Sequence, residues 1–380
     1  MQYIKRELEK TLIKYLNIFP AVAIMGPRQS GKSTFLLHLL KDDYKYVTFD
    51  DYRMLNLFYD DPEKFMQIYS NKVIFDEVQK VPELFNYLKI AIDNDRNNYG
   101  KFILSGSSQF IFLDKIKESL AGRIGLLSLL PFQYREIPSK LRSESVYKGS
   151  YPELINQKFL YNEDWYASYI ETYLNKDLKS ISNIGDIRDF RRFIRLLAAN
   201  TSQIFTMSIF SRELGVSVST IKRWVAILEA SYIIFLLPPY YKNFGKRIIK
   251  SPKLYFYDTG LVSFLTGIKT EELYDNGPMA GAIFENYIVS EIKKKILHDN
   301  KKTELFYFRT SNGVEIDLII DCDENKEFIE IKKTSSFNPR MVKNIENFLS
   351  KQDKGFLLYQ GIKMPYLPNI EIIPYNDYLN

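Results

Sequence analysis

Residues 21–34 have the sequence AVAIMGPRQSGKST and carry the clearest fold pattern in this chain. The stretch begins with a short, continuous apolar run (21–25) of the kind that forms buried parallel strands. A glycine-rich turn follows, and the next segment, FLLHLLK (35–41), carries apolar residues at helical spacing. A strand, a glycine-rich turn and a helix in this order predict the first unit of an α/β sheet domain.

The turn matches the phosphate-binding pattern G-x-x-x-x-G-K-[ST]. Its glycines allow backbone N–H groups to converge on phosphate oxygens, and the N-terminus of the helix adds a positive partial charge. We expect Lys32 to reach the β- and γ-phosphates and the Ser33 hydroxyl to ligate Mg²⁺. A glycine turn with a chance lysine is the alternative. The sequence therefore predicts ATP and Mg²⁺ as ligands of the turn residues Gly26, Pro27, Arg28, Gln29, Ser30, Gly31, Lys32, Ser33 and Thr34.

Three further strand candidates, 46–49, 73–75 and 102–104, alternate with helical or loop stretches. This alternation predicts an α/β doubly wound sheet. The second candidate ends in Asp76 and Glu77, at the sheet edge where doubly wound folds bind their ligands. We expect Asp76 to hold the Mg²⁺ and Glu77 to orient or deprotonate the attacking water. An exposed acidic strand end is the alternative.

The third of these strands, in KFILSGSS (101–108), ends in Ser105 and Ser107. A polar side chain at this position lies beside the acidic strand and could respond to the γ-phosphate. We therefore count Ser105 among the catalytic candidates. An ordinary strand-to-loop turn is the alternative.

These motifs, together with SLAGRIGLLSLLPFQYRE (119–136) and SPKLYFYDTGL (251–261), resemble prokaryotic AAA-type ATPases that carry a C-terminal restriction-endonuclease-like module. The resemblance covers nearly the whole chain. It implies a Walker A motif in the turn, a Walker B motif at the acidic pair, a sensor at Ser105 and, at Arg123, an arginine able to reach the γ-phosphate. Taken alone, Arg123 is an ordinary surface arginine. The chain departs from the family pattern at Lys176, where an arginine is expected, and lysine lacks the bidentate fork.

A second candidate site lies in residues 315–332. The stretches EIDLIID and EFIEIKK predict a hairpin, and residues two apart on a strand share a face. Glu330 and Lys332 therefore point the same way. The set resembles the D…E-x-K pattern of restriction-endonuclease-like nucleases, with Glu285 as an additional carboxylate. The resemblance implies a metal held by Glu285, Asp317 and Glu330 beside Lys332; a solvated polar strand face is the alternative.

Residues 206–230 predict two short helices around a tight turn, and a strand, a basic loop and a second strand follow. This is the order of a winged helix-turn-helix. DNA contact is predicted through cations that could straddle a phosphate backbone, namely Lys222, Arg223, Lys242, Lys246, Arg247, Lys250 and Lys253. Trp224 either stacks on bases or, as its helical spacing favours, belongs to the core. A winged helix can also dock a protein.

The bulk composition is that of a globular protein with more than one domain. The chain has 380 residues, 46% of them hydrophobic and 26% charged, and a formal charge of +6. Its single cysteine, Cys322, excludes a disulfide framework and a multi-cysteine zinc site. The N-terminus does not match a signal peptide, and the longest apolar run, 232–238, is too short for a membrane span. The cytoplasm is the expected compartment, with no membrane partner.

We predict three parts: an AAA-like P-loop ATPase domain (1–145), a helical and winged-helix region (146–275) and a restriction-endonuclease-like domain (276–380). The leading hypothesis is an ATPase that couples Mg-ATP hydrolysis to DNA binding or remodelling. A second is a regulatory nucleotide switch that acts on a protein partner and carries an inactive nuclease-like scaffold. A third is an ATP-dependent DNA nuclease. A homo-oligomer is compatible with each, since AAA-type ATPases often take an arginine from a neighbour.

Overall fold

The N-terminal part of the chain is built on a parallel sheet with the strand order β2-β3-β4-β1-β5. The computed structural model describes residues 3–106, 119–180, 186–240, 250–322 and 325–380. Within them the strands of this sheet are β1 (Ala21–Met25), β2 (Lys45–Thr48), β3 (Val73–Asp76), β4 (Phe102–Gly106) and β5 (Ile124–Ser128). Because β4 lies between β1 and β3, the residues that follow these three strands meet at one edge. This confirms the predicted α/β parallel-sheet core.

Helices cover both faces of this sheet, which explains why β1 is apolar throughout. Val22 and Ile24 pack with α1 (Leu8–Leu16) and α2 (Lys32–Leu40), whereas Ala21 and Ala23 face the cluster on the opposite side. That opposite layer consists of α3 (Tyr52–Asp60), α4 (Pro62–Ile68) and α5 (Leu84–Asp93). All five residues of β1 are buried, so the strand is held from both sides.

The middle part is helical, with one two-stranded ribbon. Its helices are α7 (Arg142–Lys148), α8 (Pro152–Asn156), α9 (Asn162–Ser180), α10 (Ile187–Ala199), α11 (Met207–Leu214), α12 (Val218–Ala230), α13 (Thr259–Thr266) and α14 (Glu271–Asn276). The antiparallel ribbon consists of β6 (Ile234–Leu237) and β7 (Lys253–Phe256). Trp224 of α12 lies 5.3 Å, between ring centroids, from both Phe190 and Phe193 of α10, and is 1% exposed. It is therefore a core residue and not a stacking surface.

The C-terminal part is a mixed sheet with the order β12-β13-β11-β10-β9-β8 among the described residues. The strands are β8 (Glu304–Arg309), β9 (Glu315–Asp321), β10 (Lys326–Ile331), β11 (Lys354–Tyr359), β12 (Met364–Leu367) and β13 (Ile370–Pro374). Strands β9 and β10 form the predicted antiparallel hairpin. The side chains of α15 (Ala280–His298) and α17 (Tyr375–Leu379) pack with one face, and α16 (Lys343–Glu346) packs with the other.

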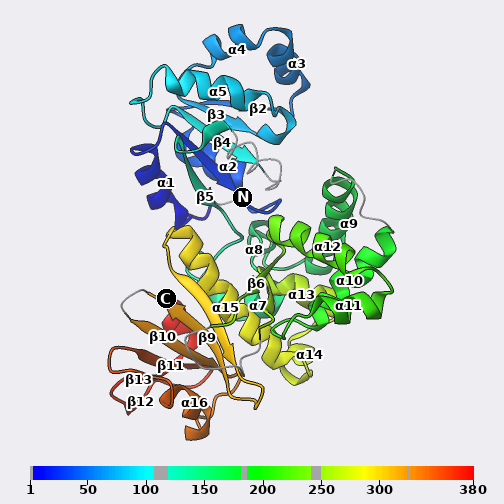
Figure 1. Ribbon diagram of the computed structural model, residues 1–380, viewed down its shortest axis with the longest axis vertical. Helices are drawn as coiled ribbons and strands as arrows, with labels where there is room; N and C mark the ends of the chain where they lie inside the picture. The colour runs from blue at the N-terminus through cyan, green and yellow to red at the C-terminus, as the bar shows by residue number, and fades with distance from the viewer. Residues whose placement is uncertain (1–2, 107–118, 181–185, 241–249, 323–324) are drawn as a thin grey trace.

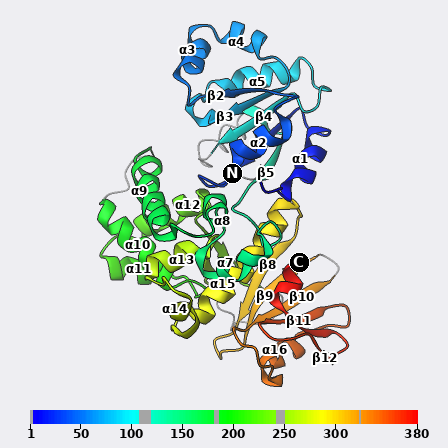
Figure 2. The ribbon, with the colours of Figure 1, turned by 180° about the vertical axis from the view of Figure 1, so that it is seen from behind.

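Helix α15 connects the three parts of the chain (Figures 1 and 2). His298 Nε2 accepts the Leu130 N–H at 3.2 Å, and Glu291 Oε2 accepts the Tyr134 N–H at 2.6 Å. These bonds fix the segment that leaves β5 against the helix that leads into the C-terminal sheet. In the part of the chain described, no helix is both long and apolar enough to cross a membrane.

Candidate functional site

The turn between β1 and α2 requires glycine at two positions. At Gly26 φ is +155°, and a Cβ atom there would lie 2.1 Å from the Leu129 carbonyl oxygen. Gly31 has φ +89° and stands directly before Lys32, the first residue of α2. The N-terminal N–H groups of α2, which have no partner within the helix, therefore lie at the end of the turn. This is the local geometry that binds phosphate.

Asp76, at the end of β3, is the centre of a hydrogen-bond cluster. Ser33 Oγ donates to its Oδ2 at 2.7 Å, and the hydroxyls of Tyr46 and Ser105 also donate to this carboxylate. The structure thus brings together three of the predicted residues, Ser33, Asp76 and Ser105. Ser105 reaches Asp76 because β4 lies between β1 and β3. Hydroxyl and carboxylate oxygens are the ligands that Mg²⁺ prefers, so this pair fits the ion.

Lys32 and Glu77 line the same cavity. Lys32 Nζ donates to the carbonyl oxygens of Gly26 and Pro27, at 3.0 and 2.9 Å. Glu77 has a left-handed backbone with φ 56°, and Gln79 donates a hydrogen bond to its carboxylate. Burial raises the pKa of Glu77 above that of an ordinary glutamate, and the charge of Asp76 raises it further. Strained backbone of this kind gathers at functional sites.

The cavity beside these residues has a volume of about 390 Å³ and polar walls. Helix α9 of the middle part contributes Tyr169 and Thr172 to its wall. The other lining residues come from the phosphate-binding turn and the acidic strand: Arg28, Gln29, Gly31, Lys32, Ser33, Thr34 and Glu77. The cavity is therefore shared between the sheet and the helical part, and its polar lining suits a triphosphate.

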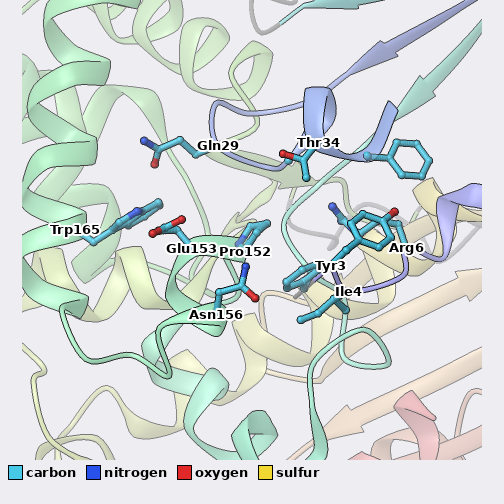
Figure 3. Close-up of a pocket in the computed structure, with 12 residues that line it drawn as sticks. Tyr3, Ile4, Arg6, Gln29, Thr34, Pro152, Glu153, Asn156 and Trp165 are labelled. Carbon is cyan, nitrogen blue, oxygen red and sulfur yellow. The ribbon is translucent and has the colours of Figure 1, made fainter. Parts of the chain in front are cut away.

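A second cavity, of about 360 Å³, adjoins the first, and the two share Gln29, Gly31 and Thr34. Apolar and aromatic residues from separate segments line it: Tyr3, Ile4, Phe35, Phe132, Pro152 and Trp165. In Figure 3, Trp165 and the segment with Tyr3 and Ile4 lie on opposite sides, with Pro152 and Asn156 between them. Its lining suits a flat heterocycle. These residues could not be predicted from the sequence, because no local pattern joins them.

Arg6 hydrogen-bonds to the phosphate-binding turn and holds it in place. No sequence pattern predicted this role. Its guanidinium donates to the Ser30 carbonyl oxygen at 2.9 Å and to the Leu130 carbonyl oxygen at 2.6 Å. It also forms an ion pair with Glu136 at 3.0 Å, and both side chains are buried. Burial of Glu136 opposes its ionisation, but Arg6 and His298 more than offset this and lower the pKa of Glu136. Arg6 therefore fixes the turn relative to the segment that leads into the middle part.

The structure does not bring Arg123 to the phosphate-binding turn of its own chain. Its carbonyl oxygen accepts the Ala21 N–H, at the start of β1, whereas the turn follows the end of that strand. Five residues of strand separate the two ends by about 15 Å. The guanidinium instead forms a two-point ion pair with Asp93, at 2.7 and 3.0 Å. Contact with a nucleotide bound by a neighbouring chain remains a prediction. The side chain of Lys176 and the whole of Ser107 are outside the described residues.

The carboxylates predicted for the C-terminal module do lie together. Glu330 pairs with Lys332 at 2.7 Å, and Asp317 Oδ2 is 3.4 Å from the same ammonium. Burial, and after it the charge of Asp317, raises the pKa of Glu330 to about 8. Glu285, the third predicted carboxylate, lies beside them, and so does Glu315, since one lysine, Lys253, contacts both. We call these four carboxylates the acidic cluster: Glu285, Glu315, Asp317 and Glu330.

A lysine from the ribbon enters the acidic cluster. Lys253 Nζ lies 2.5 Å from Glu315 Oε1, 3.0 Å from Glu285 Oε1 and 3.8 Å from Asp317 Oδ1. The prediction that Lys253 contacts DNA from the wing is wrong, because its side chain is 2% exposed. The described residues contain no group of three or more His, Cys, Asp and Glu side chains that could hold a metal ion. As it stands, the acidic cluster does not fit a divalent metal.

The remaining predicted DNA contacts divide into two groups. Lys222 and Arg223 are exposed on α12, on the side of the helix opposite its buried residues, and Lys250 is exposed just before β7. Lys242, Lys246 and Arg247 are outside the described residues. The structure therefore leaves three cations accessible near one helix and the start of one strand.

Three family models match consecutive parts of the chain. Residues 19–138 match an AAA domain, residues 139–272 a domain of unknown function (DUF8612), and residues 280–378 another (DUF4143). A Walker-type ATPase of Pyrococcus abyssi is similar in structure, with a TM-score of 0.48 at 17% identity over 68% of this chain and 94% of that one. The RuvB Holliday junction branch migration motor of Thermotoga maritima has a TM-score of 0.32 at 15% identity, over 62% and 90% of the two chains.

Similar sequences occur in bacteria and in an archaeon. An uncharacterised protein of Mycobacterium tuberculosis is 30% identical over 336 residues, which are 87% of this chain and 74% of that protein. An uncharacterised protein of Methanocaldococcus jannaschii is 25% identical over 391 residues, covering 93% of this chain and 82% of that protein. The chain therefore belongs to the same family as the mycobacterial protein and is an ATP-binding P-loop ATPase with an N-terminal AAA domain.

Proposed function

We propose that this ATPase couples Mg-ATP hydrolysis to DNA binding or remodelling. The observation that carries the proposal is that α9 forms part of the wall of the cavity beside the phosphate-binding turn. A nucleotide in that cavity contacts the sheet and the helical part together. The two parts can therefore respond to its binding and turnover.

In this proposal the triphosphate lies in the polar cavity and the base in the apolar one. Lys32 contacts the β- and γ-phosphates, while Ser33 and Asp76 hold the Mg²⁺, which neutralises charge on the phosphates. Glu77 orients the attacking water and accepts its proton, and its raised pKa suits a general base. Ser105 keeps the Asp76 carboxylate in place through its hydrogen bond.

The link from this cavity to DNA runs through adjacent helices. Helix α9 supplies the cavity wall, α10 follows it in the chain, and α10 packs on Trp224 of α12. The exposed face of α12 carries Lys222 and Arg223, two cations suited to phosphate contact. A shift of α9 on hydrolysis would move this face.

The test is an ATPase assay of the full chain with and without duplex, branched and single-stranded DNA. We expect DNA to stimulate turnover, and the double variant Lys222→Glu/Arg223→Glu to lose both the stimulation and the salt-dependent DNA binding. Lys343→Glu/Lys351→Glu is the matched control, because it changes the net charge equally at exposed sites of the C-terminal part. Equal DNA binding by the two double variants would overturn the proposed DNA-binding surface.

A second candidate is a nucleotide switch that acts on a protein partner. It is favoured by one observation, the burial of Lys253 within the acidic cluster, which suits a non-catalytic scaffold. This candidate predicts slow turnover that DNA does not change, together with partner binding that depends on the nucleotide. The same ATPase assay therefore separates the two functions.

A further inference from the structure

The position of Lys253 within the acidic cluster is fixed by hydrogen bonds to the backbone of the ribbon region on two sides. Asn286, next to Glu285 on α15, accepts the Phe256 N–H and donates to the Phe256 carbonyl oxygen, both at 2.8 Å. This clamp holds β7 against α15. Beyond β6, Tyr240 donates its N–H to the Tyr307 carbonyl oxygen at 2.7 Å, which joins the ribbon region to β8. Lys253 is therefore built into the cluster by the fold.

Each carboxylate of the acidic cluster already has an internal cation. Lys253 neutralises Glu285 and Glu315, and Arg309 lies 3.3 Å from the second oxygen of Glu315. Lys332 lies between Asp317 and Glu330. Within the cluster one buried oxygen, Glu330 Oε2, has no hydrogen-bond partner among the residues that the structure describes. A single oxygen does not make a metal site.

A divalent ion needs several oxygens at once, at about 2.0–2.6 Å. The ammonium of Lys253 occupies the space between the carboxylates that would supply them, and its charge repels a second cation. Tyr255, two residues along β7 on the same face, donates to Glu285 Oε1 at 2.6 Å and further occupies that carboxylate. The carboxylates of the nuclease-like motif are therefore present, but Lys253 and Tyr255 occupy the positions that a divalent metal would need.

We propose that Lys253 takes the place of the metal ion in the C-terminal module. The module then acts as an ion-paired joint that holds the β6–β7 ribbon against the C-terminal sheet, and it excludes divalent metals. In this arrangement the D…E-x-K residues stabilise the junction and do not cleave DNA. The proposal does not depend on DNA binding by α12.

The test is a titration of the nucleotide-free full chain with Mn²⁺, followed by electron paramagnetic resonance of the free ion. We expect the wild-type chain and Asp317→Asn to bind Mn²⁺ equally. Asparagine keeps the oxygen that accepts the Ile331 N–H at 2.9 Å, so the hairpin is preserved. We expect Lys253→Met to bind one additional Mn²⁺ per chain. Its affinity for this ion should be at least tenfold above any affinity of the wild-type cluster. The double variant Lys253→Met/Asp317→Asn should lose this gain.

Lys294→Met is the matched control, because Lys294 is an equally buried lysine, paired with Glu291 at 2.7 Å outside the cluster. It should bind Mn²⁺ like the wild type. A wild-type chain that binds one more Mn²⁺ than Asp317→Asn would overturn the proposal, and this comparison stands even if Lys253→Met does not fold. A folded Lys253→Met, by circular dichroism, that gains no Mn²⁺ would also overturn it.

Discussion

Ser33 donates a hydrogen bond of 2.7 Å to Asp76, although 43 positions separate the two residues in the sequence. The bond joins the first turn of α2 to the end of β3, so the hydroxyl and the carboxylate that suit Mg²⁺ are already adjacent. Ser105 donates to the other oxygen of Asp76 from β4, the strand that lies between β3 and β1.

Removal of the Trp165 side chain should weaken ATP binding more than turnover. Trp165 stacks on Tyr169, with ring centroids 5.1 Å apart, and forms one side of the apolar cavity. Because stacking of a base on an aromatic ring contributes about 1–3 kcal/mol, Trp165→Ala should raise the KM for ATP by about tenfold, with kcat nearly unchanged. Steady-state phosphate release measures both constants.

Tyr161→Ala provides the control for Trp165, since this nearby tyrosine is 57% exposed and does not line the cavity. Its KM should match that of the wild type. An unchanged KM in Trp165→Ala, or an equal rise in both variants, would place the base elsewhere.

Loss of the Arg6–Glu136 ion pair should destabilise the chain strongly. Arg6→Met leaves the buried Glu136 carboxylate without its charged partner, and breaking a buried pair in this way costs about 3–5 kcal/mol. The double variant Arg6→Met/Glu136→Gln should recover part of the loss. Urea unfolding followed by tryptophan fluorescence measures the change. Arg53→Met, which breaks an exposed ion pair with Asp51, should leave the unfolding midpoint almost unchanged, because water screens the two charges.

The free energy of unfolding should decrease as the pH falls below 6.5, because His298 is buried in its neutral form. Burial lowers the pKa of His298 from 6.5 to about 4, so the unfolded chain binds the proton more readily between these values. The stability that comes from a neutral histidine is thus present above pH 6.5, and it is lost progressively as the pH falls to about 4. The loss approaches about 3 kcal/mol, at 1.36 kcal/mol per pH unit.

Unfolding midpoints in urea between pH 7 and 4 test this linkage. His298→Gln should lack the part of the acid dependence that lies between pH 6.5 and 4. Identical profiles for His298→Gln and the wild type would show that other groups, such as the buried carboxylates, dominate.

The sequence predicted the parts of the site that depend on local pattern. The apolar run 21–25, the glycine turn and the acidic end of 73–76 are each readable within a few residues, and parallel strands bring their carboxyl ends to one edge. Strand β5, at the edge of the sheet, was missed because Gly125 and Ser128 interrupt its apolar run. Strands β11–β13 were missed as well.

The positions that could not be predicted from the sequence depend on long-range contacts. Arg6 is 130 positions from Glu136, and no periodicity connects them. Arg123 follows the glycine of a family motif, yet strand register places it at the wrong end of the sheet for its own phosphate-binding turn. Lys253 lies in a basic stretch, but its two-residue spacing from Tyr255 on β7 was the sign that it faces inward.

In the proposed function, the turn that contains Lys32 holds ATP while Glu77 directs its hydrolysis. The most direct measurement compares ATP turnover and ATP binding of Glu77→Gln with the wild type in Mg²⁺, with Lys32→Ala as the variant that loses the phosphate contact. We predict that Glu77→Gln binds ATP normally and loses turnover by about 10²-fold or more, since a general base contributes about 10²–10⁴-fold. Lys32→Ala should lose turnover as well. Full ATPase activity in either variant would contradict the assignment.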